Sequence, residues 1–326
     1  MVVVRNLSKR YANGKSALED VSFTIGDGRV VLLLGRNGAG KTSLIHIACQ
    51  VIRATSGSVD LGITHGRELG WCSQSQMIDW WLSVLDNVCY GPGMAGFSVG
   101  EARRRASEAL ELVGLQGEAA RNCSELSGGQ LQRVQVARVI AARPSVMFLD
   151  EPTVGLDAWT TLSLMEDIRR RADDGAIVIV SSHELDSVEE YCDEVLLLDK
   201  GRLVSHASAD EFTRTWSDKE RVFIEFEGRL PASFLHRVQG LLSGAELVGS
   251  GKPTSRSGVV QGQVHDGSES DVSSPIDVLL PAGKSLLLLK ELVSVVSVTQ
   301  FRVDRPTLAD AFLSFQRTVH GREVAG

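Results

Sequence analysis

The chain has 326 residues, of which 43% are hydrophobic and 23% charged, a composition typical of a globular protein that buries a sizeable core. Its formal net charge is −7 and no long basic stretch occurs, so nucleic acid is not expected as a partner. The five cysteines are scattered and never in C-x-x-C spacing, which argues against a disulfide framework or a zinc site. No apolar run approaches the roughly 20 residues that a membrane span needs, and no signal peptide is recognised. We therefore expect a protein of the cytosol, unless a partner holds it to a membrane.

The first 215 residues alternate short apolar runs with helical patterns, which predicts a domain with a mostly parallel α/β sheet. Continuous apolar runs are typical of strands that are buried on both faces. The clearest runs are 30–34, 146–149, 177–180 and 195–198. Helical periodicity occupies the segments between them, for example 102–113 and 130–142, and a helical subdomain is expected over about 75–143.

From about Trp216 the pattern changes, and we expect an accessory domain over 216–326. Its expected strands are 221–227, 245–248, 276–280 and 295–303, and its expected helices are 231–242, 284–292 and 307–317. This order of strand, helix, strand, strand, helix, strand suits a small α+β domain of the ferredoxin-like kind. Residues 249–275 are rich in Gly, Ser and Asp, which predicts a mobile loop.

Residues 35–42, GRNGAGKT, match the phosphate-loop pattern G-x-x-x-x-G-K-[ST] between an apolar strand and a helix expected over 43–51. The glycines let backbone N–H groups point inward at phosphate oxygens, and the helix N-terminus adds its positive dipole end. Lys41 is expected to reach the β- and γ-phosphates of a nucleotide, and the Thr42 hydroxyl to ligate Mg²⁺. The residues predicted to bind nucleotide here are Gly35, Arg36, Asn37, Gly38, Ala39, Gly40, Lys41, Thr42 and Ser43.

The apolar run 146–149 ends in two adjacent carboxylates, Asp150 and Glu151. Packing does not explain charged groups at the tip of a buried strand, because their desolvation is costly. Asp150 suits the coordination shell of Mg²⁺, and Glu151 is then placed to polarise the attacking water as a general base. The two carboxylates therefore predict hydrolysis of a nucleoside triphosphate.

The string LSGGQ at 126–130, about 20 residues before the acidic strand, resembles the signature of the ATP-binding-cassette (ABC) ATPases. The resemblance covers roughly residues 1–215 and implies an ATP-hydrolysing transporter subunit with Mg²⁺ as cofactor. It also implies a head-to-tail dimer, expected to be a homodimer, in which each ATP lies between the phosphate loop of one subunit and the signature of the other. The signature residues are Ser127, Gly128, Gly129 and Gln130. A membrane permease on a separate chain is the other implied partner, which places this chain peripherally on the cytoplasmic face of the cell membrane.

Four more site residues follow from the resemblance. Tyr11, about 24 residues before the phosphate loop, is similar to the aromatic residue that stacks on adenine. Gln74 resembles the glutamine that contacts Mg²⁺ and water, and Asp157 resembles the acidic residue of the loop that crosses to the partner subunit. His183 is similar to the histidine that touches the γ-phosphate, and it follows a parallel strand, where open α/β sheets bind ligands.

The branch of the family is less sharply defined by the sequence. PTVGLD at 152–157, the short helical subdomain and RPTLADAFL at 305–313 resemble the ATPases of drug, antibiotic and lipid exporters, so export and a link to antibiotic resistance are expected. An importer ATPase would carry the same motifs and stays open as an alternative. A soluble, non-transport ATPase of the family also stays open, although such proteins usually join two cassettes or insert long coiled coils. Trp80 and Trp81 belong either to the core or to the surface that meets the permease.

Overall fold

The computed structural model describes residues 1–73, 77–217, 219–227, 229–230, 234, 246–250, 272–273, 275–281 and 283–323. Contacts between Cα atoms divide the chain into two compact units, Met1–Ala209 and Asp210–Gly326. The boundary predicted from the sequence lies at residue 215.

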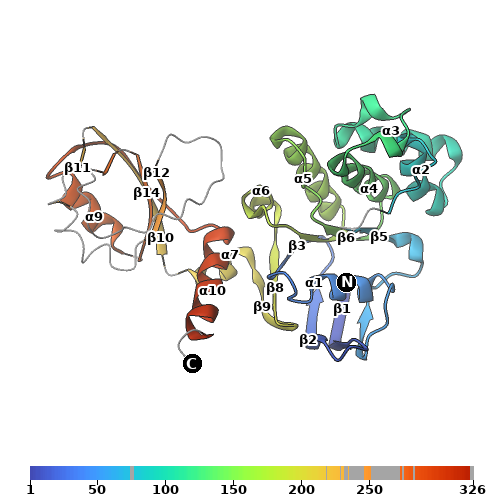
Figure 1. The fold of residues 1–326 in the computed structure, drawn as a ribbon, viewed down its shortest axis with the longest axis horizontal. Coiled ribbons are helices and arrows are strands. Elements are labelled where there is room, and N and C mark those ends of the chain that lie inside the picture. Colours follow the sequence, from blue (N-terminus) through green and yellow to red (C-terminus); the bar gives the residue numbers. More distant parts are fainter. Residues whose placement is uncertain are drawn as a thin grey trace. The chain divides into compact units, whose positions relative to one another are not determined.

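The first unit contains a large, mainly parallel sheet and a small antiparallel one (Figure 1). The large sheet has the strand order β5-β6-β7-β3-β8-β9, and every neighbouring pair is parallel except β8 and β9. The small sheet, of order β2-β1-β4, was not anticipated, because its strands mix polar and apolar residues without a long apolar run. The strands are β1 (Val2–Arg10), β2 (Ser16–Ile25), β3 (Arg29–Leu34), β4 (Ser56–Asp60), β5 (Leu69–Cys72), β6 (Val146–Asp150), β7 (Ile177–Ser181), β8 (Glu194–Asp199) and β9 (Arg202–Ser208). The predicted α/β fold with a parallel sheet is thus confirmed.

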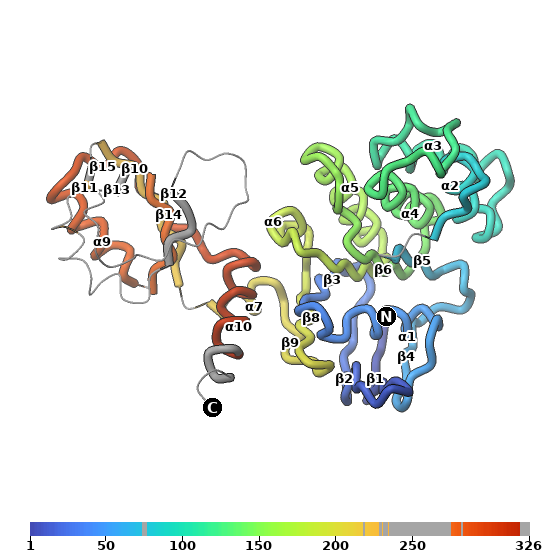
Figure 2. Tube along the Cα trace, in the orientation of Figure 1, coloured from blue at the N-terminus to red at the C-terminus, as the bar shows by residue number. Residues whose placement is uncertain are grey.

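Three helices of the first unit, α2, α3 and α4, gather at one end, away from the small sheet (Figure 2). They lie within residues 75–143, for which a helical subdomain is predicted. Each begins at a serine whose hydroxyl accepts a hydrogen bond from a backbone amide of the first turn, which satisfies one of the free amides there. The helices are α1 (Lys41–Ala48), α2 (Val84–Met94), α3 (Val99–Leu112), α4 (Gly128–Ala142), α5 (Ala158–Asp173) and α6 (Leu185–Val188), with short 3₁₀ turns at Gly66–Glu68, Gln116–Glu118, Cys123–Glu125 and Glu189–Tyr191. In the part of the chain that the structure describes, no helix has the length and apolar character to cross a bilayer.

One buried cluster joins both sheets to α1. Leu7 and Leu18 come from the small sheet, Leu33 and Ile179 from the parallel sheet, and Ile45 from α1, and each is at most 2% exposed. Burial of such a side chain stabilises the fold by about 1.5–3 kcal/mol relative to exposure. The cluster therefore fixes α1, and with it the loop that precedes α1, against the strands.

The second unit contains a four-stranded antiparallel sheet of order β12-β14-β10-β15. In chain order this is second, third, first, fourth, the order of the predicted ferredoxin-like arrangement. Leu288 and Leu292 of α9, which connects β14 with β15, belong to the same core as Val222 and Ile224 of β10. The elements are α7 (Ala209–Trp216), β10 (Lys219–Glu227), β11 (Arg229–Leu230), β12 (Glu246–Ser250), β13 (Val272–Ser273), β14 (Ile276–Pro281), α9 (Ser285–Leu292), β15 (Ser297–Asp304) and α10 (Leu308–Glu323). The helix predicted at 231–242 lies outside the described residues except for Phe234, and so does most of the loop predicted at 249–275.

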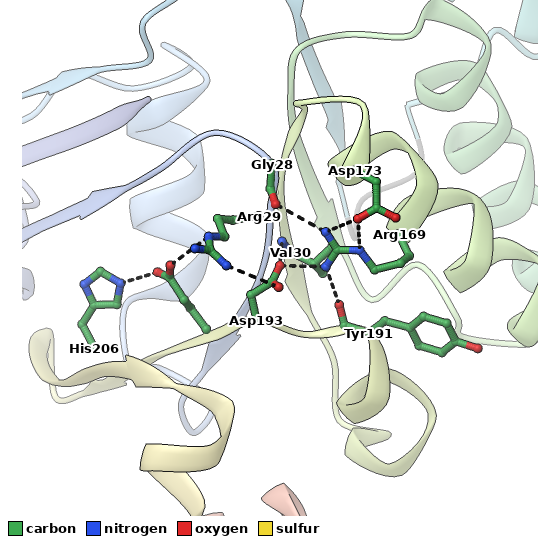
Figure 3. A network of polar contacts seen from close by, with 9 residues as sticks. Gly28, Arg29, Val30, Arg169, Asp173, Tyr191, Asp193 and His206 are labelled. Carbon is green, nitrogen blue, oxygen red and sulfur yellow. Dashed lines mark hydrogen bonds and ion pairs between the residues drawn. The ribbon is translucent and has the colours of Figure 1, made fainter.

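A polar network in the first unit holds together the beginnings of β3 and β8 (Figure 3). Asp193, which precedes β8, accepts hydrogen bonds from the Val30 amide at 2.8 Å and from Arg169 Nη1 of α5 at 2.7 Å. Arg169 also donates to the carbonyls of Gly28, at 3.3 Å, and Tyr191, at 3.2 Å. The network extends to Arg29, Glu194 and His206. Since these groups lie where the parallel strands begin, they brace β3 at the end opposite to the phosphate loop.

Asp193→Ala tests this brace, because it leaves the Arg169 guanidinium and the Val30 amide without their shared acceptor. We expect the amides of β3 and β8 to exchange faster with solvent, by an amount that corresponds to about 2–4 kcal/mol less opening free energy. Hydrogen exchange measures this directly. Asp173→Ala is the matched control, because Asp173 is 65% exposed and pairs with the same arginine, a kind of ion pair worth about 0–1 kcal/mol. Equal protection in the two variants would show that the network does not hold the strands.

Candidate functional site

The loop between β3 and α1 passes so close to its neighbours that two of its positions have room only for glycine. A Cβ atom on Gly35 would lie 2.4 Å from the Leu198 carbonyl oxygen, and one on Gly40 would lie 2.6 Å from that of Ala17. Both glycines also have a positive φ, 150° and 110°, which disfavours any other residue. The resulting turn leads into the N-terminus of α1, the geometry of a phosphate cradle.

Lys41, the first residue of α1, folds its ammonium group over this loop. Its Nζ donates to the carbonyls of Gly35 and, at 3.4 Å, Arg36. Burial lowers the pKa of Lys41, and the nearby charges of Asp150 and Glu151 oppose that decrease. The phosphate loop and the acidic pair predicted from the sequence therefore belong to one site.

Tyr11 also reaches this site, from the end of β1. Its hydroxyl lies 3.1 Å from Ser43 Oγ in the first turn of α1, and Lys9 Nζ lies 5.1 Å from the centre of its ring. The structure thus brings Tyr11 to the phosphate loop, and stacking on adenine stays a prediction. The remaining predicted residues of the loop divide into an exposed group, Arg36, Asn37, Gly38 and Thr42, and the buried Ala39.

Asp150 is held by a serine that the sequence did not single out. Asp150 and Ser181 end the neighbouring strands β6 and β7 and lie in register. The Ser181 hydroxyl donates to Asp150 Oδ1. The Glu151 amide donates to the Ser181 carbonyl oxygen at 3.1 Å, so Ser181, itself fully buried, orients both acidic residues. A single serine at the end of a strand is a weak indicator of a functional site in a sequence. Its contact with the two acidic residues becomes evident only when the order of the strands is known.

Glu151 and His183, both predicted to be catalytic, are in contact. The Glu151 carboxylate accepts a hydrogen bond from the His183 amide at 3.1 Å, and its other oxygen lies 3.1 Å from His183 Nε2. Burial raises the pKa of Glu151, whereas His183 and Lys41 lower it. Because a carboxylate with a raised pKa accepts a proton more readily, this environment suits a general base.

The signature begins α4 with a reciprocal cap. Ser127 Oγ accepts from the Gln130 amide at 3.3 Å, and Gln130 Oε1 accepts from the Ser127 amide at 2.9 Å. The amides of Gly128 and Gly129 have no hydrogen-bond acceptor among the described residues. Two free amides at a helix N-terminus can bind an anion, as the predicted role of the signature requires.

The predicted crossing loop lies beside the signature of its own chain. A Cβ atom on Gly155 would be 3.4 Å from the Cα atom of Gly129. Asp157 caps α5 by accepting from the amide of Thr160 at 2.9 Å and from its hydroxyl at 3.0 Å, and these bonds lower the pKa of Asp157. Asp157 therefore has a structural role in its own subunit, and its contact with a partner stays a prediction.

A chain of buried amide hydrogen bonds runs from the acidic strand through α4. Gln132 Nε2 donates to the backbone carbonyl of Asp150 at 3.2 Å. Gln135 Nε2 donates to Gln132 Oε1 at 3.0 Å, and Gln135 Oε1 accepts from the Met77 amide at 3.0 Å. The sequence did not point to either glutamine, because a helical glutamine is usually exposed, whereas these are at most 8% exposed.

These hydrogen bonds involve residues on both sides of the segment that contains Gln74. Residues 74–76 lie outside the described residues, so the predicted role of Gln74 stays a prediction. Cys72 precedes the segment, and its Sγ lies 3.5 Å from Gln132 Nε2. Burial raises the pKa of Cys72 to about 12, so it is a neutral thiol. Since Met77 follows the segment, the two buried glutamines are positioned to couple it to the acidic pair.

The residues fit a Mg²⁺–nucleotide complex better than a metal ion held by protein alone. Among the described residues, no cluster of three or more His, Cys, Asp or Glu could hold a metal ion. Mg²⁺ in nucleotide sites takes one or two protein ligands and completes its shell with phosphates and water. Thr42 and Asp150, beside a cradle shaped by Gly35 and Gly40, fit that pattern.

Comparison with known proteins agrees with this geometry. The family model described as ABC transporter matches residues 18–154. A methionine import ATP-binding protein of Yersinia pestis is 37% identical over 261 residues, which cover 73% of this chain and 78% of that protein. An energy-coupling factor transporter ATP-binding protein of Methanosphaera stadtmanae is 33% identical over 239 residues, which cover 70% and 84%.

A solved structure supports the same family. A dimeric ATP-binding cassette in a post-hydrolysis state, bound to ADP and Pi, superposes with a TM-score of 0.58 at 28% identity, over 64% of this chain and 98% of that one. The chain therefore belongs to the ABC transporter ATPases. It is an ATP hydrolase that uses Mg²⁺.

Gln135→Met tests the role of the two glutamines as positioning residues. The substitution keeps the length of the side chain and removes both of its hydrogen bonds, so we expect kcat to fall by about tenfold, which corresponds to about 1.4 kcal/mol, with little change in the KM for ATP. Steady-state ATPase assays separate the two constants. The control is Gln116→Met at an exposed site. A change in KM alone, or a loss of folded protein without a kcat effect, contradicts the assignment.

The acid limb of the pH profile tests Glu151. The residue must be ionised to accept a proton, and burial raises its pKa, so single-turnover hydrolysis should fall with decreasing pH at a midpoint above the ordinary value of a glutamate. His183→Ala removes an interaction that lowers this pKa, and should move the midpoint to higher pH. An unchanged midpoint in that variant would show that His183 does not affect the pKa of Glu151.

Proposed function

We propose that this chain is the ATPase subunit of an ABC importer, acting as a homodimer with a permease on a separate chain at the cytoplasmic face of the membrane. We infer the direction of transport, import, from the similarity to the methionine import relative. It covers 73% of this chain, about 238 of 326 residues, and the first unit has 209 residues, so the match continues into the second unit. The match therefore includes at least about 29 residues of the second unit in addition to the ATPase unit.

The export interpretation of the sequence has no comparable support. The Yersinia pestis and Methanosphaera stadtmanae relatives are named for methionine import and for an energy-coupling factor. The segment 305–313, which suggested drug, antibiotic or lipid export, carries no motif that contacts nucleotide. The import alternative therefore replaces export, and a role in antibiotic resistance is not proposed.

In the proposed mechanism, the loop amides and Lys41 bind the phosphates of ATP, and Tyr11 stacks on adenine. Thr42, Asp150 and Gln74 would hold Mg²⁺, which would supply charge neutralisation at the phosphates when bound. Glu151 accepts a proton from the attacking water, and His183 orients the Glu151 carboxylate through two contacts.

The amides of Gly128 and Gly129 bind the γ-phosphate held by the second subunit, so that ATP joins the two subunits. Hydrolysis then removes the shared ligand and lets the dimer open. Ser127 and Gln130 contribute by holding these amides in position through their reciprocal cap.

Exposed apolar side chains in the segment that precedes α2 support a permease partner. Trp81 is 91% exposed, and Met77 and Trp80 are exposed in the same segment. Aromatic side chains and methionine are enriched at protein interfaces. These side chains follow directly after the segment 74–76, so a permease bound there would act on the nucleotide site through Gln74.

Capture of the assembly tests the proposal. Glu151→Gln should bind ATP, hydrolyse it poorly and stay dimeric, so the tagged variant purified from detergent-solubilised membranes with ATP should co-elute with a multi-span membrane protein. Mass spectrometry identifies that protein and any substrate-capture component bound to it. The control is the same variant with Lys41→Ala, which should lose the ATP-dependent dimer. A permease without any capture component would favour export, and dimer alone or ribosomal proteins would favour the soluble class.

A further inference from the structure

A cleft in the first unit lies between α3, the end of α4 and α5. Its cavity measures about 130 Å³, and a water molecule needs only about 10–15 Å³ of such volume. The charged residues of its lining are Arg105, Glu108, Arg143, Asp167, Arg170 and Arg171. The cleft has no residue in common with the phosphate loop, the acidic pair or the signature.

The lining carries a net positive charge. Four arginines and two carboxylates give +2, in a chain whose net charge is −7. Asp167 is neutralised twice, by Arg170 and by Arg171, and Glu108 pairs with Arg104 outside the cleft. The C-terminal end of α4 contributes a partial negative charge of about one half, which is too small to cancel the excess. Charge of one sign inside a cleft attracts counter-ions.

Arg105 has a fixed guanidinium group with one hydrogen-bond donor that has no acceptor in the described part of the chain. Arg105 Nε pairs with Glu101 at 2.6 Å, and its guanidinium lies over the Phe97 ring with Cζ 3.8 Å from the ring centre. Arg105 Nη1 is buried and has no hydrogen-bond partner among the described residues. A buried donor without an acceptor is unfavourable, and Arg105 lines the cleft, so an anion bound there would offer this guanidinium an acceptor once the side chain turns toward it.

Arg143 provides a second free guanidinium at the mouth of the cleft. It ends α4 in the left-handed conformation, with φ of 51°, and it is exposed. No ion pair of Arg143 occurs among the described residues. Since Arg143 follows α4 and Arg105 lies on α3, the two arginines line the cleft from different helices.

We propose that this cleft binds a small phosphate-type oxyanion, held by Arg105, Arg143 and Arg170. The guanidinium fork matches the oxygens of a phosphate group, which accepts two parallel hydrogen bonds from it. Three helices wall a cavity of about 130 Å³, which leaves no space for a peptide segment. Inorganic phosphate and the phosphate headgroup of a lipid present the same group, and the experiment distinguishes them.

The location gives the anion a mechanical role. α4 begins at the signature and α5 begins after Asp157, and these beginnings approach each other at Gly129 and Gly155. The cleft lies at the other end of the same two helices. A bound anion therefore ties together the far ends of the helices that carry the signature and the crossing loop.

Amide NMR on the full chain tests the site. The phosphate loop is first saturated with a non-hydrolysable ATP analogue and Mg²⁺, and inorganic phosphate is then titrated at constant ionic strength, with chloride as the reference anion. We expect saturable shifts at the amides of Ala109 and Ala141, which line the cleft. The double variant Arg143→Gln, Arg170→Gln should bind at least about tenfold more weakly.

Arg103→Gln is the matched control, because Arg103 is an exposed arginine of α3 outside the cleft, and it should leave the affinity unchanged. If the double variant loses its folded spectrum, Arg105→Lys, which keeps the charge and removes the guanidinium fork, is titrated instead and should also weaken binding. Vesicles containing phosphatidic acid form the second arm. Binding to vesicles without shifts from free phosphate would assign the site to a lipid headgroup. No saturable shift in either arm, or equal affinity in wild type and variant, would overturn the proposal.

Discussion

The site depends on the close approach of the loop after β3 to the backbones of β2 and β8. The carbonyl oxygens of Ala17 and Leu198 occupy the space that side chains at Gly40 and Gly35 would need. Both glycines have a positive φ, and the turn that they form leads directly into the N-terminus of α1. The approach persists because leucine and isoleucine side chains of both sheets and α1 are buried in one cluster. The packing of the core therefore also determines the shape of the phosphate cradle.

The acidic pair shows how the fold tolerates charge at a buried strand end. Glu151 is 5% exposed and has a φ of 53°, and both features are unfavourable for a carboxylate residue. Its contacts with His183 and Lys41 offset part of the desolvation but not all of it, since the net effect raises the pKa of Glu151. Asp150 differs because the Ser181 hydroxyl donates directly to it. Two adjacent carboxylates thus have different environments, as a metal ligand and a base require.

Local patterns predicted the parts of the site that are contiguous in sequence. The phosphate loop, the strand that ends in Asp150 and the signature could be recognised because the chemistry needs those residue types at fixed spacing. Ser181, Gln132 and Gln135 could not, since their importance arises from strand order and from packing of α4 against β5 and β6. The small antiparallel sheet was missed because its strands mix polar with apolar residues, and the apolar run of β1 is only three residues long.

The signature explains why one subunit is chemically incomplete. Ser127 and Gln130 satisfy each other, which holds the helix end rigid and leaves the amides of Gly128 and Gly129 free. Among the described residues, no hydrogen bond joins these amides to the phosphate loop of the same chain. In the proposed mechanism, this helix N-terminus binds the nucleotide that the other subunit holds. Under this proposal, dimerisation supplies the missing half of each site, and the energy of ATP binding becomes available to move a permease attached to the helical part.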